Sequence, residues 1–271
     1  GSNNGTNNGP ATLVTSNVYI GNIPVNGVST TLQQSDLQQS DLQFDSPYSN
    51  YSLSFDGATY IDCGNDSILT PTNSISISLW VKTNDSGNYK GLIDKWNGTS
   101  ITGYMIDLGP SGSNQGKARF SISDQNSLAT TVAINDGNWH HIVVTCNNTN
   151  GFIYLDGIQN NTASLTMTGI ANSDNLKIAG DNTSTFYLNG KIDETSIFNY
   201  SLSAAQVLEI YNNGRPKDLS TFSGTAPISW WRLGENAYFD NNSFIVPNSI
   251  SGAPNGTGSG TINTMISADA P

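Results

Sequence analysis

The sequence has few of the residues on which many functional classes depend. Only 11% of its 271 residues are charged, and 10 Lys and Arg against 21 Asp and Glu give a net charge of -11. A chain with this balance offers little to displace the counterions of a nucleic acid, and it suits an anionic membrane surface no better. We therefore expect no nucleic-acid partner.

Long apolar runs and leader patterns are also missing. No run of 18 apolar residues occurs, so we expect no membrane insertion. The chain shows no signal-peptide pattern and starts with Gly-Ser, so we expect a processed chain or part of a longer one. Asn, Ser, Thr and Gly supply the polarity that charged residues do not. This texture is common outside cells, and the expected localisation is extracellular, at a cell surface or at a virion surface.

Cysteine and histidine are scarce. Cys63 and Cys146 set no disulfide framework. They would pair if their strands lie face to face, but we favour two buried thiols that act as small apolar side chains. The only histidines, His140 and His141, follow Trp139. Motifs of serine hydrolases, zinc peptidases and phosphate loops do not occur.

Apolar and polar residues alternate with a period of two through the middle of the chain, which predicts half-buried strands. Residues 74–83 place Ile75, Ile77, Leu79 and Val81 on one face. The same pattern recurs in residues 117–123, 140–146, 151–157, 175–180 and 190–199. Turn-forming residues separate these segments, and Asp156-Gly157 predicts a two-residue hairpin turn. The prediction is an all-β fold, an antiparallel two-sheet jelly-roll sandwich.

One short helix is expected after the last of these strands. Ser203 is its predicted N-cap and Gly214 its predicted stop. The apolar stripe at helical spacing comprises Ala204, Val207, Leu208 and Tyr211.

The two ends differ from the middle in composition. We divide the chain into a polar N-terminal segment with possible strands (1–45), a jelly roll with its helix (46–213), a linker (214–227) and a small β-rich segment (228–271). Exposed strands in the terminal segments need partners. Either they pair within the chain as a small second sheet, or a terminal strand adds to the next subunit and builds a homo-oligomer or filament. An Asn-Gly-Thr match between 4–6 and 255–257 slightly favours serial assembly.

Four segments occur in an order that resembles a known family. They are YSLSFDGATYIDCGN (51–65), SISISLWVKT (74–83), NDGNWHHIVVTCNNTNGFIYLDG (135–157) and FYLNGKIDETSIFNYSLSAAQVLEIYNNG (186–214). Together they resemble the laminin-G-like domain, third laminin G group, of the concanavalin-A-like lectin/glucanase jelly rolls, over roughly residues 50–213. The resemblance implies that the Trp-His-His segment is scaffold. Neighbouring side chains on a strand point to opposite faces, so His140 and His141 are not expected to share a site.

Catalysis is considered because folds of this shape include glycoside hydrolases. A retaining hydrolase needs two carboxylates about 5 Å apart. As strand neighbours, Asp193 and Glu194 are expected on opposite faces, which is the wrong arrangement. We expect no enzyme, and the alternative is a carbohydrate-active enzyme or its detached binding module.

Calcium is the expected cofactor, as a structural ion, because Asp, Glu and Asn oxygens suit it. The first and last strands are neighbours in this jelly roll, so Asp56 is expected to meet Asp193 or Glu194 at one sheet edge. A second site, implied by similarity to the pentraxin relatives, involves Asp85 and Asp181. The alternative is that these residues only make turns.

Sugar binding needs exposed aromatic rings. Trp96 and Tyr104 flank a loop that would present them, although they fit the core equally well, whereas Trp80 and Trp139 are expected in the core. The expected function is non-enzymatic adhesion or structure, with glycans or other protein subunits as partners.

Overall fold

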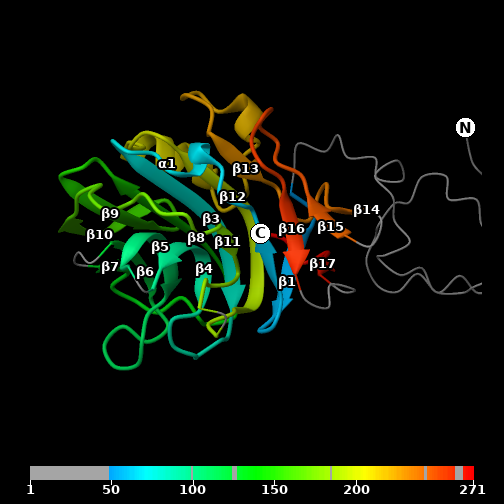
Figure 1. Ribbon diagram of the computed structural model, residues 1–271, viewed down its shortest axis with the longest axis horizontal. Helices are drawn as coiled ribbons and strands as arrows, with labels where there is room; N and C mark the ends of the chain where they lie inside the picture. Colours follow the sequence, from blue (N-terminus) through cyan, green and yellow to red (C-terminus); the bar gives the residue numbers. More distant parts are fainter. Residues whose placement is uncertain (1–48, 99, 124–126, 184, 241–242, 260–264) are drawn as a thin grey trace, which may run out of the picture.

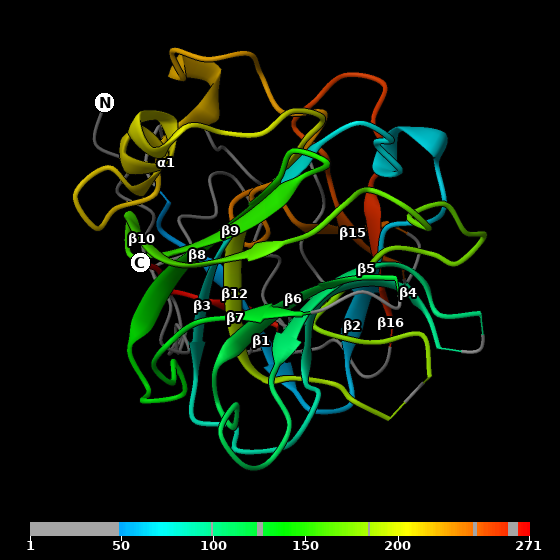
Figure 2. The same ribbon diagram turned by 90° about the vertical axis from the view of Figure 1, so that its left-hand side faces the viewer.

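The computed structural model describes residues 49–271 except 99, 124–126, 184, 241–242 and 260–264. The chain folds into two stacked antiparallel sheets (Figure 1), and Figure 2 shows strands β3, β8 and β9 in one layer and β5, β6 and β7 in the other. The predicted all-β sandwich is confirmed. The predicted strands of residues 1–45, and the Asn-Gly-Thr at 4–6, lie outside the described residues.

The first sheet has the order β10-β9-β8-β3-β12-β1-β17, and β13 also pairs with β12. Its strands are β1 (Ser52–Asp56), β3 (Ile75–Thr83), β8 (Trp139–Cys146), β9 (Asn150–Leu155), β10 (Ile158–Ser164), β12 (Asn189–Phe198), β13 (Ser229–Trp231) and β17 (Ile266–Ser267).

The second sheet has the order β14-β15-β16-β2-β11-β4-β5-β6-β7. Its strands are β2 (Tyr60–Asp62), β4 (Gly91–Asn97), β5 (Thr102–Leu108), β6 (Ala118–Ile122), β7 (Leu128–Ala129), β11 (Lys177–Ile178), β14 (Tyr238–Asp240), β15 (Ser243–Val246) and β16 (Gly256–Ser259).

The main core fills the space between the sheets. The predicted inward stripe of β3 is fully buried there, namely Ile75, Ile77, Leu79 and Val81. Cys63 and Cys146 are separate buried thiols and form no disulfide. Packing of these alternating side chains, and not a covalent staple, therefore holds the two sheets together.

The β9–β10 hairpin turns at Asp156-Gly157 as predicted, with Leu155 opposite Ile158. Both turn residues have positive φ, 51° and 80°, the conformation that a two-residue turn of this kind requires. Glycine is needed for a second reason, because a Cβ at Gly157 would lie 2.6 Å from the ring of Tyr211.

Helix α1 (Ala204–Tyr211) covers the outer face of the first sheet. Ser203 caps it through a capping box with Gln206, as the sequence predicted for the N-terminus. The helix ends earlier than predicted, at Asn212 in the left-handed conformation. The predicted stripe is wrong at Ala204 and at Leu208, which are exposed, Leu208 by 55%, because the buried positions are Val207 and Ile210.

The adjacent histidines point to opposite faces, as predicted. His141 is buried beside Trp80 and Tyr211, with ring centroids 4.8 and 5.8 Å away, and its Nε2 lies 2.8 Å from Ser78 Oγ. Burial lowers the pKa of His141 to about 3. His140 instead contacts Asp156 at 2.9 Å on the other face. Both rings therefore serve the scaffold.

The C-terminal segment is part of the sandwich and does not form a sheet of its own. Strand β13 joins the first sheet through β12, β17 joins it through β1, and β14–β16 extend the second sheet through β2. Figure 1 shows these orange and red strands on the opposite side from β9 and β10. The predicted linker also packs: Leu219, in a short 3-10 helix (Leu219–Thr221), and Phe222 are buried with α1 against the first sheet.

Candidate functional site

A bulge in β12 shapes a buried cluster of charged side chains. The register against β3 shifts between Asp193 and Ser196, and Glu194 has a φ of 47°. At the same place the other neighbour of β12 changes, from β1 at Ile192 to β13 at Thr195. An extra residue in one strand bends it and re-aims its side chains.

The bulge brings together carboxylates that we expected to be apart. Carboxylate oxygens of Asp193, Glu194 and Glu235 all lie within 4.8 Å of one another, and we call these residues the acidic cluster. The expectation that Asp193 and Glu194 face opposite ways is therefore wrong, because it assumed a regular strand. Glu235, which follows β13, was not predicted. Its one sequence signal is a charge inside an aromatic segment.

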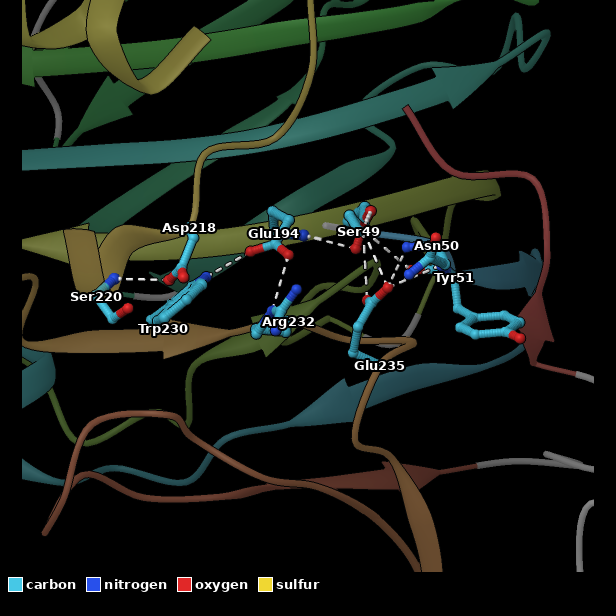
Figure 3. Close-up of polar contacts among 10 residues, drawn as sticks. Ser49, Asn50, Tyr51, Glu194, Asp218, Ser220, Trp230, Arg232 and Glu235 are labelled. Carbon is cyan, nitrogen blue, oxygen red and sulfur yellow. Dashed lines mark hydrogen bonds and ion pairs between the residues drawn. The ribbon is translucent and has the colours of Figure 1, made fainter. Parts of the chain in front are cut away.

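Glu194 is the member of the acidic cluster that contacts Trp230 and Arg232. Its carboxylate accepts hydrogen bonds from Trp230 Nε1 at 2.5 Å and from Arg232 Nε at 3.1 Å. Figure 3 shows it between these two side chains, both carried by the segment that contains β13. The bulged residue thus fastens the C-terminal segment to the sheet.

The other two carboxylates accept hydrogen bonds from the residues that precede β1. Asp193 accepts from Ser49 Oγ at 2.6 Å, and Glu235 accepts from the backbone N–H groups of Asn50 and Tyr51, the latter at 2.9 Å. Figure 3 shows Glu235 reaching toward Ser49 and Asn50. The cluster therefore joins three segments that are distant in sequence.

Burial dominates the electrostatics of the acidic cluster. Its members are 0–6% exposed, and desolvation raises the pKa of Glu194 and of Glu235 to about 7. The pKa of Asp193 is raised well above its usual range by desolvation and by the two nearby carboxylates. Arg232 partly offsets these effects. In chemical terms the three carboxylates suit a hard cation with oxygen ligands, but their oxygens already accept hydrogen bonds from the chain.

The other predicted metal ligands are elsewhere and bind turn backbones. Asp56 lies opposite Asn189 at the start of β12, away from Asp193, and accepts from Ala58 N and Thr59 N at 2.9 and 3.0 Å. The structure does not bring Asp56 to Asp193 or Glu194, because the acidic pair lies further along β12.

The pentraxin-like pair also occupies turns. Asp85 accepts from Gly87 N at 2.8 Å and from Asn189 N at 3.0 Å. Asp181 accepts from Phe186 N at 2.9 Å and from two nearby threonines. The turn-forming alternative describes their contacts.

The two predicted sugar-binding aromatics differ in exposure. Tyr104 is fully buried and donates to the Leu69 carbonyl at 2.8 Å, so it belongs to the core and is not an exposed platform. Trp96 is half-buried on β4 opposite Gly103. Of the two predicted core tryptophans, Trp80 is buried but Trp139 is half-buried, because Trp139 lies at the start of β8.

A polar groove of about 660 Å³ lies where β1 and β3 end and β12 begins. Its lining residues are Ser54, Asp56, Gly57, Lys82, Thr83, Asn84, Asp85, Ser86, Lys90, Asn189, Gly190 and Lys191. It holds three of the ten basic residues of the chain, Lys82, Lys90 and Lys191. Lys90 forms no ion pair with any residue that the structure describes. The predicted residues Asp56 and Asp85 both line this groove.

Comparison with known proteins identifies the family. The family model described as the concanavalin A-like lectin/glucanases superfamily, in its third laminin G group, matches residues 55–208. The chain belongs to this superfamily. The match ends within α1, so β13–β17 of this laminin-G-like chain lie outside the matched region. No curated protein matches the chain.

Solved structures share the laminin-G-like fold at low identity. A "putative carbohydrate binding protein" from Bacteroides ovatus is 14% identical with a TM-score of 0.60, covering 82% of this chain. This chain spans 62% of that protein. The CBM40 of a Ruminococcus gnavus IT-sialidase is 12% identical with a TM-score of 0.50, covering 60% of this chain and 99% of its own. Among the described residues, no helix has the length and apolar character to span a membrane.

Proposed function

We propose that this chain binds glycans in the polar groove and does not catalyse their cleavage. The groove carries the proposal, because it is solvent-accessible and every residue that lines it is polar, charged or glycine. Support comes from the two solved structures of similar fold. One is named as a "putative carbohydrate binding protein" and the other as the CBM40 of a sialidase, so neither name describes a catalytic domain.

The chemistry of the groove suits sugar hydroxyls, which both donate and accept hydrogen bonds. Asn84 and Asn189 offer amides, Asp56 and Asp85 offer carboxylate oxygens, and Lys90 offers an ammonium group. The turn contacts of Asp56 and Asp85 fix these carboxylates in place before a ligand arrives. A site held in its bound geometry loses less entropy on binding.

Glycan binding is tested on an array of neutral and acidic glycans, followed by titration calorimetry with the best ligand. Replacing Asn84 and Lys90 together by alanine should weaken binding at least tenfold, which corresponds to about 1.4 kcal/mol. Lys117→Ala, which removes a lysine that does not line the groove, is the matched control and should bind normally. An empty array, or equal binding by the double variant, would contradict the proposal.

The acidic cluster is the natural place to look for catalysis, and its geometry argues against it. Two carboxyl groups with a pKa of about 7 have the values expected of a general acid. However, Glu194 and Glu235 are almost fully buried and bind Trp230, Arg232 and the backbone near Ser49, so no sugar fits between them. Release of reducing ends from a bound polysaccharide would overturn this reading.

We further propose the acidic cluster, in place of Asp56, as the position of the predicted structural calcium. Its three carboxylates supply oxygen ligands of suitable spacing, and an ion there would share them with Arg232. Thermal unfolding with calcium and with a chelator tests this. At 100 times the dissociation constant the ion should add about 2.7 kcal/mol of stability. An unchanged melting temperature would remove calcium from the account.

We propose that the chain works in adhesion or structure outside the cell or on a virion surface. Strands β13–β17 pair within the chain, so a filament built by strand addition would depend on residues 1–45. Electron microscopy of native material tests both points. A monomer found inside cells would contradict them.

A further inference from the structure

A row of polar side chains crosses the outer face of the first sheet beside the groove. Trp139 of β8 lies opposite Lys82 of β3, Lys82 lies opposite Lys191 of β12, and Lys191 lies opposite Ser54 of β1. Like charges directly opposite one another on neighbouring strands destabilise a sheet. The pairing of Lys82 with Lys191, which we call the lysine pair, therefore favours an anion placed over both.

In this structure the anion is the carboxylate of Asp269. Lys82 Nζ donates to it at 2.9 Å, Lys191 Nζ at 2.5 Å and Trp139 Nε1 at 3.0 Å. Burial alone would raise the pKa of Asp269, but the hydrogen bonds from the two lysines and from Trp139 outweigh it and lower that pKa to about 2. The sheet thus presents a three-donor receptor for a carboxylate.

The contact that fills this receptor is accessible to solvent. The side chain of Asp269 is 37% exposed, and those of Lys82 and Lys191 are 32% and 25% exposed. Asp269 follows β17, which has two residues, and its backbone carbonyl accepts from Ser52 Oγ. Exposed ion pairs of this kind contribute little stability, so another carboxylate can take the place of Asp269.

The receptor also opens into the groove. Lys82 and Lys191 line the groove and bind Asp269 at the same time. A ligand in the groove therefore meets the lysine pair directly, and Trp139 adds an indole beside it.

We infer that the lysine pair and Trp139 form the carboxylate subsite of the groove, and that Asp269 occupies it until an acidic sugar displaces it. The ligand class is a glycan that carries a carboxylate, either a uronic acid or a sialic acid. This inference rests on the proposed glycan binding and narrows it to acidic glycans.

The test is calorimetric titration of the full chain and of Asp269→Ala with a galacturonate oligosaccharide, sialyllactose, neutral lactose and, as a carboxylate polymer without sugar, poly-glutamate. The variant should bind one or both carboxylated sugars at least tenfold more tightly than the wild type, with lactose unchanged. The carboxylated sugar whose affinity increases shows whether the ligand is a uronic acid or a sialic acid. Adding Lys82→Met and Lys191→Met should abolish the gain, whereas Asp66→Ala, which removes an exposed carboxylate away from the groove, should show none.

Three results would overturn the inference: no gain in Asp269→Ala, an equal gain for lactose, or an equal gain for poly-glutamate. Wild-type glycan binding that depends on Asn84 and Lys90 would leave the proposed function standing in each case. If neither the wild type nor any variant binds a glycan, both the inference and the proposed function are wrong. If Asp269→Ala unfolds, Ser52→Ala releases only the backbone of Asp269 and should show a smaller gain in the same direction.

Discussion

The acidic cluster and the lysine pair make an informative comparison because each has a member on β12, close to the other. Lys191 and Asp193 are alternate residues of β12 and point to the same outer face. Both charged groups are completed by the C-terminal segment, one through Arg232 and Glu235 and the other through Asp269.

Exposure separates the two groups. The carboxylates of the acidic cluster are nearly inaccessible, whereas a quarter to a third of each lysine is exposed. A buried charge must keep its partners, since losing one leaves an uncompensated charge in a poorly solvated place. An exposed pair can exchange partners at little cost. On the same face of the sheet, the acidic cluster therefore has a structural role, whereas the lysine pair can exchange one carboxylate for another.

The largest effect is expected from Glu194→Ala. It removes the carboxylate that both Trp230 and Arg232 contact, and breaking a buried ion pair costs about 3–5 kcal/mol. Urea unfolding at pH 8, where Glu194 is ionised, measures this loss, and Glu194→Gln, which keeps one of the two acceptor oxygens, should lose less. A loss no larger than that of Asp269→Ala would erase the distinction between the two groups.

A pH profile of stability should separate the groups by sign. The pKa of Glu194 and of Glu235 is raised from 4.5 to about 7, so the folded state binds these protons more tightly than the unfolded state. Their contribution is fully present below pH 4.5 and is lost as the pH rises through 7, by roughly 3 kcal/mol at most for each group. Asp269, with a pKa lowered to about 2, behaves oppositely: its contribution is present above pH 3.8 and is lost as the pH falls through 2.

Unfolding free energies measured between pH 2 and pH 8 in the presence of a chelator, so that no calcium occupies the acidic cluster, check both signs. We expect a maximum of stability near pH 5. Stability that rises from pH 5 to pH 8 would show that the acidic cluster is not held in a neutral form. Glu235→Gln should flatten the decline above pH 5.

The smallest effect is expected from Asp269→Ala. Exposed ion pairs contribute about 0–1 kcal/mol, so the loss of stability should be within this range and should shrink as salt screens the lysine pair. Urea unfolding at low and high ionic strength measures it. A loss of 3 kcal/mol that ignores salt would make Asp269 a structural residue.

The sequence predicted regular structure well and irregular structure poorly. Alternation placed Ile75 and Val81 in the core, and strand geometry separated His140 from His141, because both rules hold wherever a strand is regular. The acidic cluster escaped prediction because it depends on the bulge at Glu194, and no composition rule marks where a register shifts.

Long-range pairing was the second limit. Glu235 and Asp269 reach their partners only because β13 and β17 join the first sheet, which a Pro- and Gly-rich linker did not suggest. Tyr104 was ambiguous for a different reason. A tyrosine beside a loop fits an exposed sugar-binding surface and a buried core position with a hydrogen-bonded hydroxyl equally well.

Hydrogen–deuterium exchange with and without the best-binding glycan tests the central claim most directly. Residues 82–90 and 189–191 should exchange more slowly with the glycan, because they line the groove. Residues 266–270 should exchange faster with an acidic glycan as Asp269 is displaced, and residues 230–235 should not change, because the acidic cluster stays closed. Protection confined to the second sheet, or opening at 230–235 equal to that at 266–270, would contradict the account.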